Sequence, residues 1–219
     1  MQNCFVSWSG GKDALFALYK ELKKSPSLSP ILLNMCDADE NQSRSHGISA
    51  QMLRHQAKAL NFPIHQAFVD ERGYEVVLKE AITLLKNEHA VTHGIFGDIY
   101  LWEHRTWIER VCTDMDITPL FPLWDLDTTT LITEFIALGF KTIVLATQED
   151  KLNQSFLGRT IDYQFVQELP TEVDPCGELG EYHTFVYDGP LFQKPVTFTL
   201  GEDRYDDKHH RITLIPNLA

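Results

Sequence analysis

Apolar and polar residues alternate along the first two thirds of the chain in a way that predicts strands followed by helices. Short apolar runs are separated by longer segments in which apolar residues recur every three or four positions. The predicted strands span residues 4–8, 31–36, 64–69, 90–96, 117–124 and 141–146, and the predicted helices span 15–24, 48–60, 74–85, 102–115 and 128–138. Strands that alternate with helices are typical of a parallel sheet covered by helices on both faces.

The pattern changes after residue 148. Residues 150–169 predict short helices, and the runs 185–187, 196–200 and 211–215 predict strands of a small antiparallel sheet. We therefore expect a first domain over residues 1–148 and a C-terminal α+β subdomain over residues 149–219.

A glycine-containing loop joins the first predicted strand to the first predicted helix. It reads Ser9-Gly10-Gly11-Lys12-Asp13. A strand, a tight turn and a helix bring free backbone N–H groups and a helix N-terminus to one point, which stabilises an anion. The glycines allow a phosphate to approach the backbone, while Lys12 adds a positive charge and Ser9 a hydroxyl. These features favour a phosphate site over the alternative, a glycine turn before an ordinary helix.

Two common phosphate loops do not match this sequence. A Walker A loop would need a glycine at position 6, where the chain has Val6. The Gly-x-Gly-x-x-Gly fingerprint would need its second glycine at position 12, where the chain has Lys12. The loop instead resembles the pyrophosphate loop of the N-type ATP pyrophosphatases, which cleave ATP between the α and β phosphates.

Further candidate residues lie where the predicted strands end. His46 follows the second strand, and Gly97 and Asp98 follow the fourth. Ligands of open α/β sheets bind at the carboxyl ends of the strands, so both His46 and Asp98 could contact a ligand. The alternatives are that His46 caps a helix and that Asp98 is only a turn residue.

An acidic segment near the C-terminus is the second informative stretch. Residues 174–184 combine carboxylates, a histidine and glycines with little apolar content. Such a segment could hold a magnesium ion through oxygen ligands, bind an ammonium-type substrate or position a base. The alternative is a solvated loop. A zinc site is not expected, because Cys176 and His183 have no second ligand pair at the required spacing.

Composition limits the classes of function. The 219 residues carry a formal net charge of −12, which argues against general nucleic-acid binding. We find no apolar run long enough to span a bilayer and no basic-then-apolar leader pattern. The four cysteines are far apart and lack a Cys-x-x-Cys pair, so we expect reduced thiols in a cytoplasmic protein.

Several motifs in this order resemble the diphthine–ammonia ligase family. They are Ser9-Gly10-Gly11-Lys12-Asp13, His46-Gly47 with Gln56-Ala57, Gly97-Asp98-Ile99 with Arg105, Glu109 and Arg110, Pro122-Leu123-Trp124, and Cys176-Gly177-Glu178 with Gly180-Glu181-Tyr182-His183-Thr184. The last group is the family-specific one. The resemblance implies a Rossmann-like α/β fold of the adenine nucleotide alpha hydrolase type. It also implies an ATP-dependent ligase in which a carboxylate is adenylated, pyrophosphate leaves and ammonia displaces AMP to form an amide.

The resemblance also implies roles for individual residues. The implied nucleotide-binding residues are Ser9, Gly10, Gly11, Lys12, Asp13, Met35, Cys36, His46, Gly97 and Asp98, and the implied catalytic residues are Lys12, Glu178, Glu181 and His183. The glycine loop would hold the β and γ phosphates, and backbone groups near Met35 and Cys36 would hold the adenine. Asp13 would cap the helix or bind Mg²⁺. Arg105 and Arg110 would neutralise the acyl carboxylate or form surface pairs with Glu109.

The partners implied are ATP, ammonia and a carboxylate acceptor, which is diphthine on elongation factor two in the family or else a small-molecule acid. A homodimer is compatible with the resemblance. Two residues depart from the family pattern: Ala14 stands where serine is usual, and Leu179 stands where a small or polar residue is usual. These departures keep open an ATP or AMP sensor without turnover. Another ATP-pyrophosphatase, such as a tRNA-modifying enzyme, is the remaining alternative.

Overall fold

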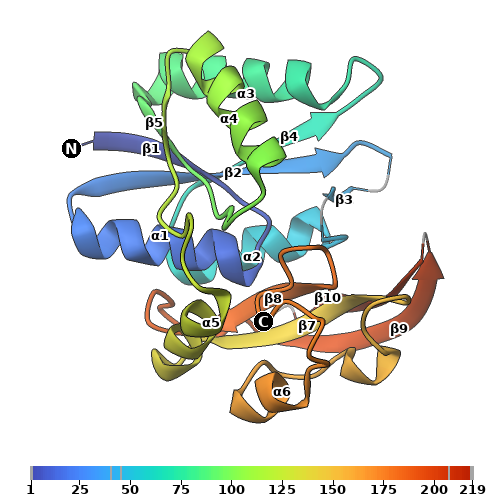
Figure 1. The fold of residues 1–219 in the computed structure, drawn as a ribbon. Coiled ribbons are helices and arrows are strands. Elements are labelled where there is room, and N and C mark those ends of the chain that lie inside the picture. The colour runs from blue at the N-terminus through green and yellow to red at the C-terminus, as the bar shows by residue number, and fades with distance from the viewer. Residues whose placement is uncertain (1, 40, 45, 207, 218–219) are drawn as a thin grey trace.

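The first sheet is organised around β1 (Gln2–Ser7), as the computed structural model in Figure 1 shows. The structure describes residues 2–39, 41–44, 46–206 and 208–217. β1 pairs in parallel with β2 (Leu28–Asp37) and with β5 (His93–Ile95). β4 (Ile64–Val69) extends the sheet beyond β2, β6 (Thr118–Leu120) extends it beyond β5, and the short β3 (Gln42–Ser43) pairs antiparallel with the end of β2.

Helices cover both faces of this sheet, which confirms the predicted α/β architecture (Figure 1). α1 (Lys12–Lys24) and α2 (Ala50–Leu60) pack on one face, while α3 (Tyr74–His89) and α4 (Trp102–Asp114) pack on the other. Adjacent residues of β1 therefore enter different cores: Val6 joins the α1/α2 side and Phe5 the α3/α4 side. The strand order reverses between β1 and β5, and ligands of open α/β sheets bind at such a switch point.

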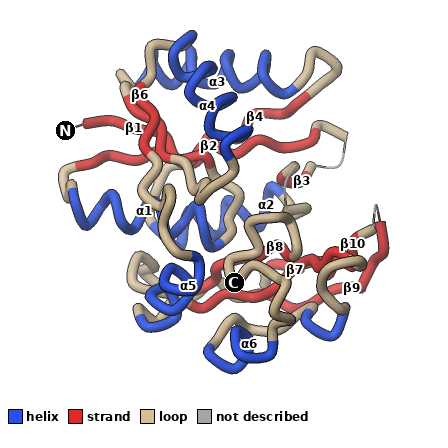
Figure 2. Tube along the Cα trace, viewed as in Figure 1, coloured by secondary structure: helices blue, strands red, loops and turns tan. Residues whose placement is uncertain are grey.

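A second, antiparallel sheet lies on the α1/α2 side of the molecule (Figures 1 and 2). Its order is β8 (Tyr182–Asp188), β7 (Lys141–Gln148), β10 (His209–Pro216) and β9 (Phe198–Asp206). α5 (Thr128–Ala137) leads into β7, and the 3₁₀ helix Gln154–Phe156 and α6 (Tyr163–Glu168) connect β7 to β8. The prediction of an antiparallel C-terminal sheet is confirmed.

The prediction that residues 141–146 belong to the parallel sheet is wrong. This segment is β7, which pairs antiparallel with β8 and β10. Six consecutive residues of β7 are buried, because both faces of the strand are covered. An unbroken apolar run of this kind cannot be distinguished by its pattern from a strand of a parallel sheet. The division of the chain at residue 148 stays a prediction.

The remaining elements lie close to their predicted places. The strands predicted at 90–96 and 117–124 are shorter, since only residues 93–95 and 118–120 pair in the sheet. The first helix begins earlier, at Lys12, directly after the glycine loop. All four cysteines are free and buried, which agrees with the expected absence of disulfide pairing.

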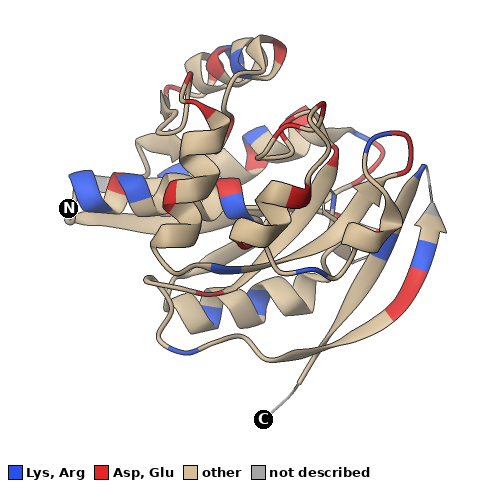
Figure 3. Cartoon of the chain, turned by 60° about the horizontal axis from the view of Figure 1, so that its bottom comes forward, with Lys and Arg blue, Asp and Glu red and all other residues tan. Residues whose placement is uncertain are grey.

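Charged residues of both signs are interspersed over helices, loops and the second sheet (Figure 3). Among the described residues, no helix is both long and apolar enough to cross a membrane. The absence of general nucleic-acid binding, inferred from the net charge, stays a prediction.

Candidate nucleotide-binding site

Lys12 and Asp13 of the predicted loop belong to α1, so the name glycine loop is kept below for residues 8–11, which join the end of β1 to the start of α1 in a crowded environment. Gly10 has a φ of +83°, and a Cβ there would lie 2.4 Å from the Cδ2 atom of Leu53. A Cβ on Gly11 would lie 2.4 Å from the Cε1 atom of His46. A Cβ at either position would therefore displace a neighbouring side chain, so glycine is favoured by the protein's own packing in addition to any need for a ligand to approach closely.

Residues far away in the sequence hold this loop in place. The backbone N–H of Lys12 donates to the hydroxyl of Thr184 (3.1 Å), and the N–H of Val186 donates to the carbonyl of Gly10 (3.1 Å). The fully buried Gln56 donates from Nε2 to the carbonyls of Gly10 (2.9 Å) and Val186 (2.7 Å). Its Oε1 atom accepts from the indole of Trp8 (3.0 Å). These bonds join the loop to α2 and to β8.

Gln56 and Thr184 were not among the candidate site residues. Gln56 lies on the otherwise apolar face of α2 that carries Leu53, Ala57 and Leu60. A polar side chain in such a stripe is the signal that could have identified it, because buried polar groups need hydrogen-bond partners.

The acidic loop, residues 174–181, is held by bonds among its own residues and by bonds to neighbouring elements. Asp174 Oδ1 accepts from the N–H groups of Cys176 (2.8 Å) and Glu178 (3.3 Å), and Glu181 Oε1 accepts from the N–H of Asp174 (3.1 Å). Tyr182 closes the segment by donating its hydroxyl to the carbonyl of Pro175 (2.6 Å). The segment is thus an ordered loop with turn glycines, and its role in binding or catalysis stays a prediction.

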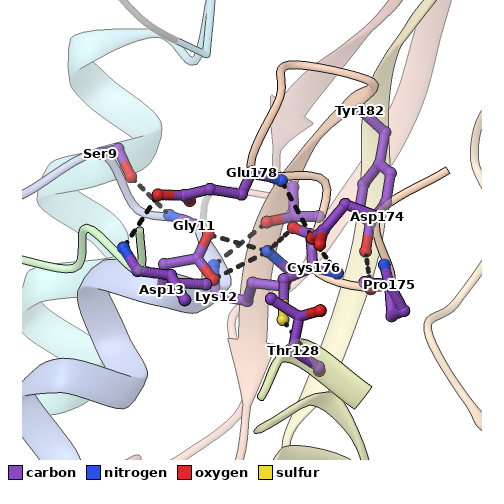
Figure 4. Close-up of polar contacts among 12 residues, drawn as sticks. Ser9, Gly11, Lys12, Asp13, Thr128, Asp174, Pro175, Cys176, Glu178 and Tyr182 are labelled. Carbon is purple, nitrogen blue, oxygen red and sulfur yellow. Dashed lines mark hydrogen bonds and ion pairs between the residues drawn. The ribbon is translucent and has the colours of Figure 1, made fainter. Parts of the chain in front are cut away.

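Lys12 connects the two loops. Its ammonium group contacts both carboxylate oxygens of Asp13 (2.8 Å each) and the carbonyl of Cys176, as Figure 4 shows. Lys12 is only 3% exposed. Burial disfavours its charged form, but the carboxylate of Asp13 opposes this effect and raises the pKa of Lys12 above its ordinary value. The ammonium group therefore stays charged at neutral pH.

Glu178 extends from the acidic loop toward Ser9 and Asp13 (Figure 4). Its Oε1 atom accepts a hydrogen bond from the backbone N–H of Ile99 (2.8 Å), in the segment that follows β5. Burial raises the pKa of Glu178 to about 7, and the nearby charges of Asp13 and Asp98 act in the same direction. A carboxylate with this pKa can gain or lose a proton near neutral pH, as a general base must.

A cavity of about 540 Å³ brings many of the predicted residues together. Its lining includes Ser9, Lys12, Asp13, His46, Gly97, Asp98, Glu178 and His183, together with Ala14 and Leu179, the two departures from the family pattern. Gly97 is held tightly here, because a Cβ at this position would lie 2.7 Å from the backbone carbon of Asp13. The cavity thus lies between the glycine loop, the end of β5 and the acidic loop.

Of the predicted site residues, five do not line this cavity: Gly10, Gly11, Met35, Cys36 and Glu181. Met35 lines an adjacent cavity of about 450 Å³, which has an aromatic wall that includes Tyr74 and Trp107. Cys36 is buried, with its thiol 2.9 Å from the Oδ1 atom of Asn34. The buried Glu181 keeps one carboxylate oxygen bonded to Asp174, and its other oxygen has no hydrogen-bond partner among the described residues.

The two histidines of the site are packed against each other. The ring centroids of His46 and His183 are 4.8 Å apart, and the Nδ1 atom of His46 lies 2.9 Å from the carbonyl oxygen of Thr184. Burial lowers the pKa of His46 to about 4 and that of His183 well below its ordinary value. Both rings are therefore neutral at physiological pH.

Arg105 and Arg110 form surface ion pairs. Arg105 contacts Glu109 (2.7 Å), as one predicted alternative stated, while Arg110 contacts Glu75 (2.6 Å) rather than Glu109. Neither arginine is among the residues that line the two cavities.

The fold and the site define an α/β protein of a nucleotide-binding type, with a cavity at the switch point of a parallel sheet. The chain belongs to the diphthamide synthase family. The model of the diphthamide synthase N-terminal domain matches residues 2–119, and the model of the C-terminal domain matches residues 127–215. The resemblance drawn from the motifs is confirmed.

Curated relatives named diphthine–ammonia ligase match most of the chain. The protein of Rattus norvegicus is 26% identical over 220 residues, covering 89% of this chain and 82% of the relative. The protein of Danio rerio is 28% identical over 218 residues, covering 89% and 85%. A solved structure described as a "predicted subunit of tRNA methyltransferase" from Methanocaldococcus jannaschii aligns with 90% of this chain and 100% of its own, at a TM-score of 0.46 and 16% identity.

Proposed function

We propose that this protein is an ATP-dependent, amide-forming ligase that joins ammonia to a carboxylate. The observation that carries the proposal is the cavity of about 540 Å³ in which Lys12 and Glu178, 166 positions apart in the sequence, line one space. One side of this space supplies the groups that hold a polyphosphate. The other supplies a carboxylate with a pKa of about 7. The relatives named diphthine–ammonia ligase support the same reaction class.

In the first step an oxygen of the acceptor carboxylate attacks the α phosphorus of ATP. The bond between the α phosphorus and the bridging oxygen breaks, and pyrophosphate leaves. Ser9 and Lys12 line the cavity and would hold the β and γ phosphates through a hydroxyl group and a positive charge. The backbone N–H of Gly11 is bonded to the Ser9 hydroxyl (3.2 Å) and would have to exchange this partner for a phosphate oxygen. The aromatic cavity beside Met35 has the size and apolar lining that suit an adenine ring.

In the second step ammonia attacks the carbonyl carbon of the acyl adenylate. A carbon–nitrogen bond forms, the bond to AMP breaks, and the nitrogen loses a proton. Glu178 is the residue that we assign to this proton, because it combines position in the cavity with a pKa near the working pH. Glu181 is assigned a positioning role through Asp174, since it lies outside the cavity. His183 forms part of the wall as a neutral ring.

The cavity also suits a magnesium ion when nucleotide is bound. Asp13, Asp98 and Glu178 line it, and their mutual repulsion contributes to the raised pKa of Glu178. Within the described part of the chain, no group of three or more His, Cys, Asp or Glu side chains is arranged to hold a metal by itself. Mg²⁺ usually combines one or two carboxylates with substrate phosphates, so Asp13 and Asp98 would be its protein ligands. The ion would neutralise phosphate charge.

The acceptor proposed from the family name is diphthine, and a small-molecule acid is the other candidate. Ala14 and Leu179 both line the cavity, which favours one second function, a nucleotide-binding sensor that does not turn over ATP. The two functions differ in whether pyrophosphate appears.

The test is pyrophosphate release from ATP, measured with diphthine-bearing elongation factor two, with small carboxylic acids, and with or without ammonium. We expect acceptor-dependent release and an amide product that requires ammonium. Glu178→Gln should lower amide formation about 100-fold or more and spare ATP binding. Glu172→Gln, an exposed carboxylate just before the acidic loop, is the matched control. ATP binding without pyrophosphate release for any acceptor would favour the sensor, and release stimulated by tRNA without ammonium would favour a tRNA-modifying enzyme.

A further inference from the structure

A third cavity, of about 340 Å³, has one described lining residue, His46, in common with the nucleotide-site cavity. It lies where the segment after β3 meets the second sheet. The polar residues and the glycine that line it are Gln42, His46, Gly47, Arg204, Arg211 and Thr213, and we call it the arginine cavity. None of its described lining residues is acidic, although the chain carries a net charge of −12.

The two arginines are directly opposite each other across a strand pair. Arg204 of β9 and Arg211 of β10 are partners in the antiparallel register. Directly opposite residues point to the same face with their Cβ atoms about 5 Å apart, and like charges at such positions repel. A Cβ on Gly47 would lie 3.6 Å from the Nη1 atom of Arg211, so this guanidinium lies beside the backbone that follows His46. Both cations are therefore directed to one confined space.

The chemistry of this lining selects one class of ligand. A guanidinium group presents paired N–H donors that match the oxygens of a carboxylate or a phosphate. One arginine is sufficient for the two oxygens of a carboxylate, whereas a tetrahedral dianion offers enough oxygens for two guanidinium groups at once. Thr213 and Gln42 add a hydroxyl and an amide that can donate to the remaining oxygens.

We propose that the arginine cavity is a second anion site, distinct from the nucleotide site, that binds a phosphate-type oxyanion between Arg204 and Arg211. The oxyanion can be inorganic phosphate or pyrophosphate, or the phosphate group of a nucleotide. The bound anion lowers the repulsion between the two guanidinium groups. This proposal does not depend on the proposed ligase reaction, because it concerns binding alone.

The test is calorimetric titration of the full chain with pyrophosphate, phosphate, AMP and ATP at low ionic strength. We expect pyrophosphate to bind at two sites in the unmodified protein. Lys12→Ala should weaken the nucleotide site and leave the second site intact. Arg204→Gln and Arg211→Gln should each weaken the second site about tenfold or more and leave the first unchanged. Lys141→Gln removes an exposed cation from another strand of the same sheet and is the matched control.

Thermal unfolding of each variant, with and without pyrophosphate, shows whether it remains folded. Arg204 is exposed, so Arg204→Gln should fold normally even if Arg211→Gln does not. Tighter second-site binding of pyrophosphate than of AMP would identify the inorganic anion as the ligand, and the reverse would identify a nucleotide. A single pyrophosphate site that Lys12→Ala abolishes and Arg204→Gln leaves unchanged would overturn the proposal, whether or not the protein forms amides.

Discussion

The glycine loop and the acidic loop line the same cavity but are held in place in different ways. The glycine loop depends on partners outside itself, namely Gln56 on α2, Thr184 on β8 and the ring of His46. The acidic loop has bonds among its own residues through Asp174 and Glu181, in addition to the hydrogen bonds that it accepts from Ile99, Lys12 and Lys151. Distant substitutions should therefore disturb the glycine loop strongly, while changes within the acidic loop should have local effects.

Alanine at a positive-φ glycine of each loop should give the largest difference in stability between the two loops. Gly10 and Gly180 have φ values of +83° and +82°, so the backbone strain of alanine is the same at both, about 1 kcal/mol. At Gly10 the Cβ also meets Leu53 at 2.4 Å, whereas at Gly180 its nearest neighbour is 4.0 Å away. Overpacking adds about 1–3 kcal/mol, so we expect Gly10→Ala to cost about 3 kcal/mol and Gly180→Ala about 1 kcal/mol.

Urea unfolding of both variants measures this difference in the free energy of unfolding. The two variants are matched controls for each other, because their φ values agree. Equal losses of stability would mean that Leu53 and the glycine loop adjust freely, and that external packing does not fix the loop.

Gln56→Leu tests the hydrogen bonds that hold the glycine loop from α2. The variant leaves the indole N–H of Trp8 and the carbonyl of Val186 without the partners that Gln56 supplies in a fully buried position. Each buried unpaired group costs about 1–3 kcal/mol, so we expect a loss of roughly 3 kcal/mol. ATP affinity should fall as well, because the carbonyl of Gly10 loses one of its two donors.

Gln51→Leu is the control for this change, since Gln51 is exposed on the same helix. The free energy of unfolding and the ATP affinity are measured for both variants. A loss seen only in Gln56→Leu comes from the glycine loop, whereas a loss seen in both comes from the helix propensity of leucine. If Gln56→Leu had the same stability and ATP affinity as Gln51→Leu, the hydrogen bonds of Gln56 would contribute little to holding the glycine loop.

Local sequence patterns predict most of the helices and strands, but not which strands pair with each other. The strand, glycine turn and helix at the start of the chain are encoded locally, and so are the helices up to residue 138. The partner of a strand is not encoded locally. β7 has the continuous burial of a parallel strand, yet it pairs with β8 and β10 because the chain after residue 148 returns to it.

In the candidate site, too, some residues could be found from sequence motifs, whereas the contacts that position them could not. Ser9, Lys12 and Glu178 belong to motifs with a recognisable spacing, and the structure brings them to one cavity. The contact between Thr184 and the N–H of Lys12 joins residues 172 positions apart, so no local pattern could predict it. Likewise, the position of Glu181 outside the cavity follows from its bond to Asp174, which no spacing rule predicts.

The pH dependence of stability should have opposite signs at the two loops. The pKa of Glu178 is raised from 4.5 to about 7, so between these pH values the native state holds a proton that the unfolded chain has lost. Stability therefore falls as pH rises through this range. The pKa of His46 is lowered from 6.5 to about 4, so the unfolded chain binds the extra proton and stability rises with pH over that range.

Glu178→Gln should remove the first effect and leave the second. At pH 8 the variant should be more stable than the unmodified protein by roughly 3 kcal/mol, and at pH 4 the difference should vanish. Thermal unfolding from pH 4 to pH 8 measures this, with Glu172→Gln as the control that keeps the unmodified profile. An unchanged slope between pH 5 and pH 7 in Glu178→Gln would contradict the raised pKa of this carboxyl group.

The smallest changes in stability are expected at the two departures from the family pattern, Ala14 and Leu179. Substitutions there instead test which substrate each loop binds. Ala14 lies in the first turn of α1, and Leu179, 50% exposed, lies in the acidic loop. Leu179→Asn should change the free energy of unfolding by about 0.5 kcal/mol or less. Ala14→Ser should cost about 1 kcal/mol, because Ala14 is only 6% exposed and its environment must accommodate a hydroxyl group. Ala14→Ser adds a hydroxyl beside the proposed phosphate site and should tighten ATP binding up to about tenfold.

Leu179→Asn should leave ATP affinity unchanged and alter the KM of the carboxylate acceptor, because the acidic loop is assigned to that substrate. If Leu179→Asn changed ATP affinity while Ala14→Ser did not, the assignment of ATP to the glycine loop and of the acceptor to the acidic loop would be wrong. The two loops could still line one cavity in that case.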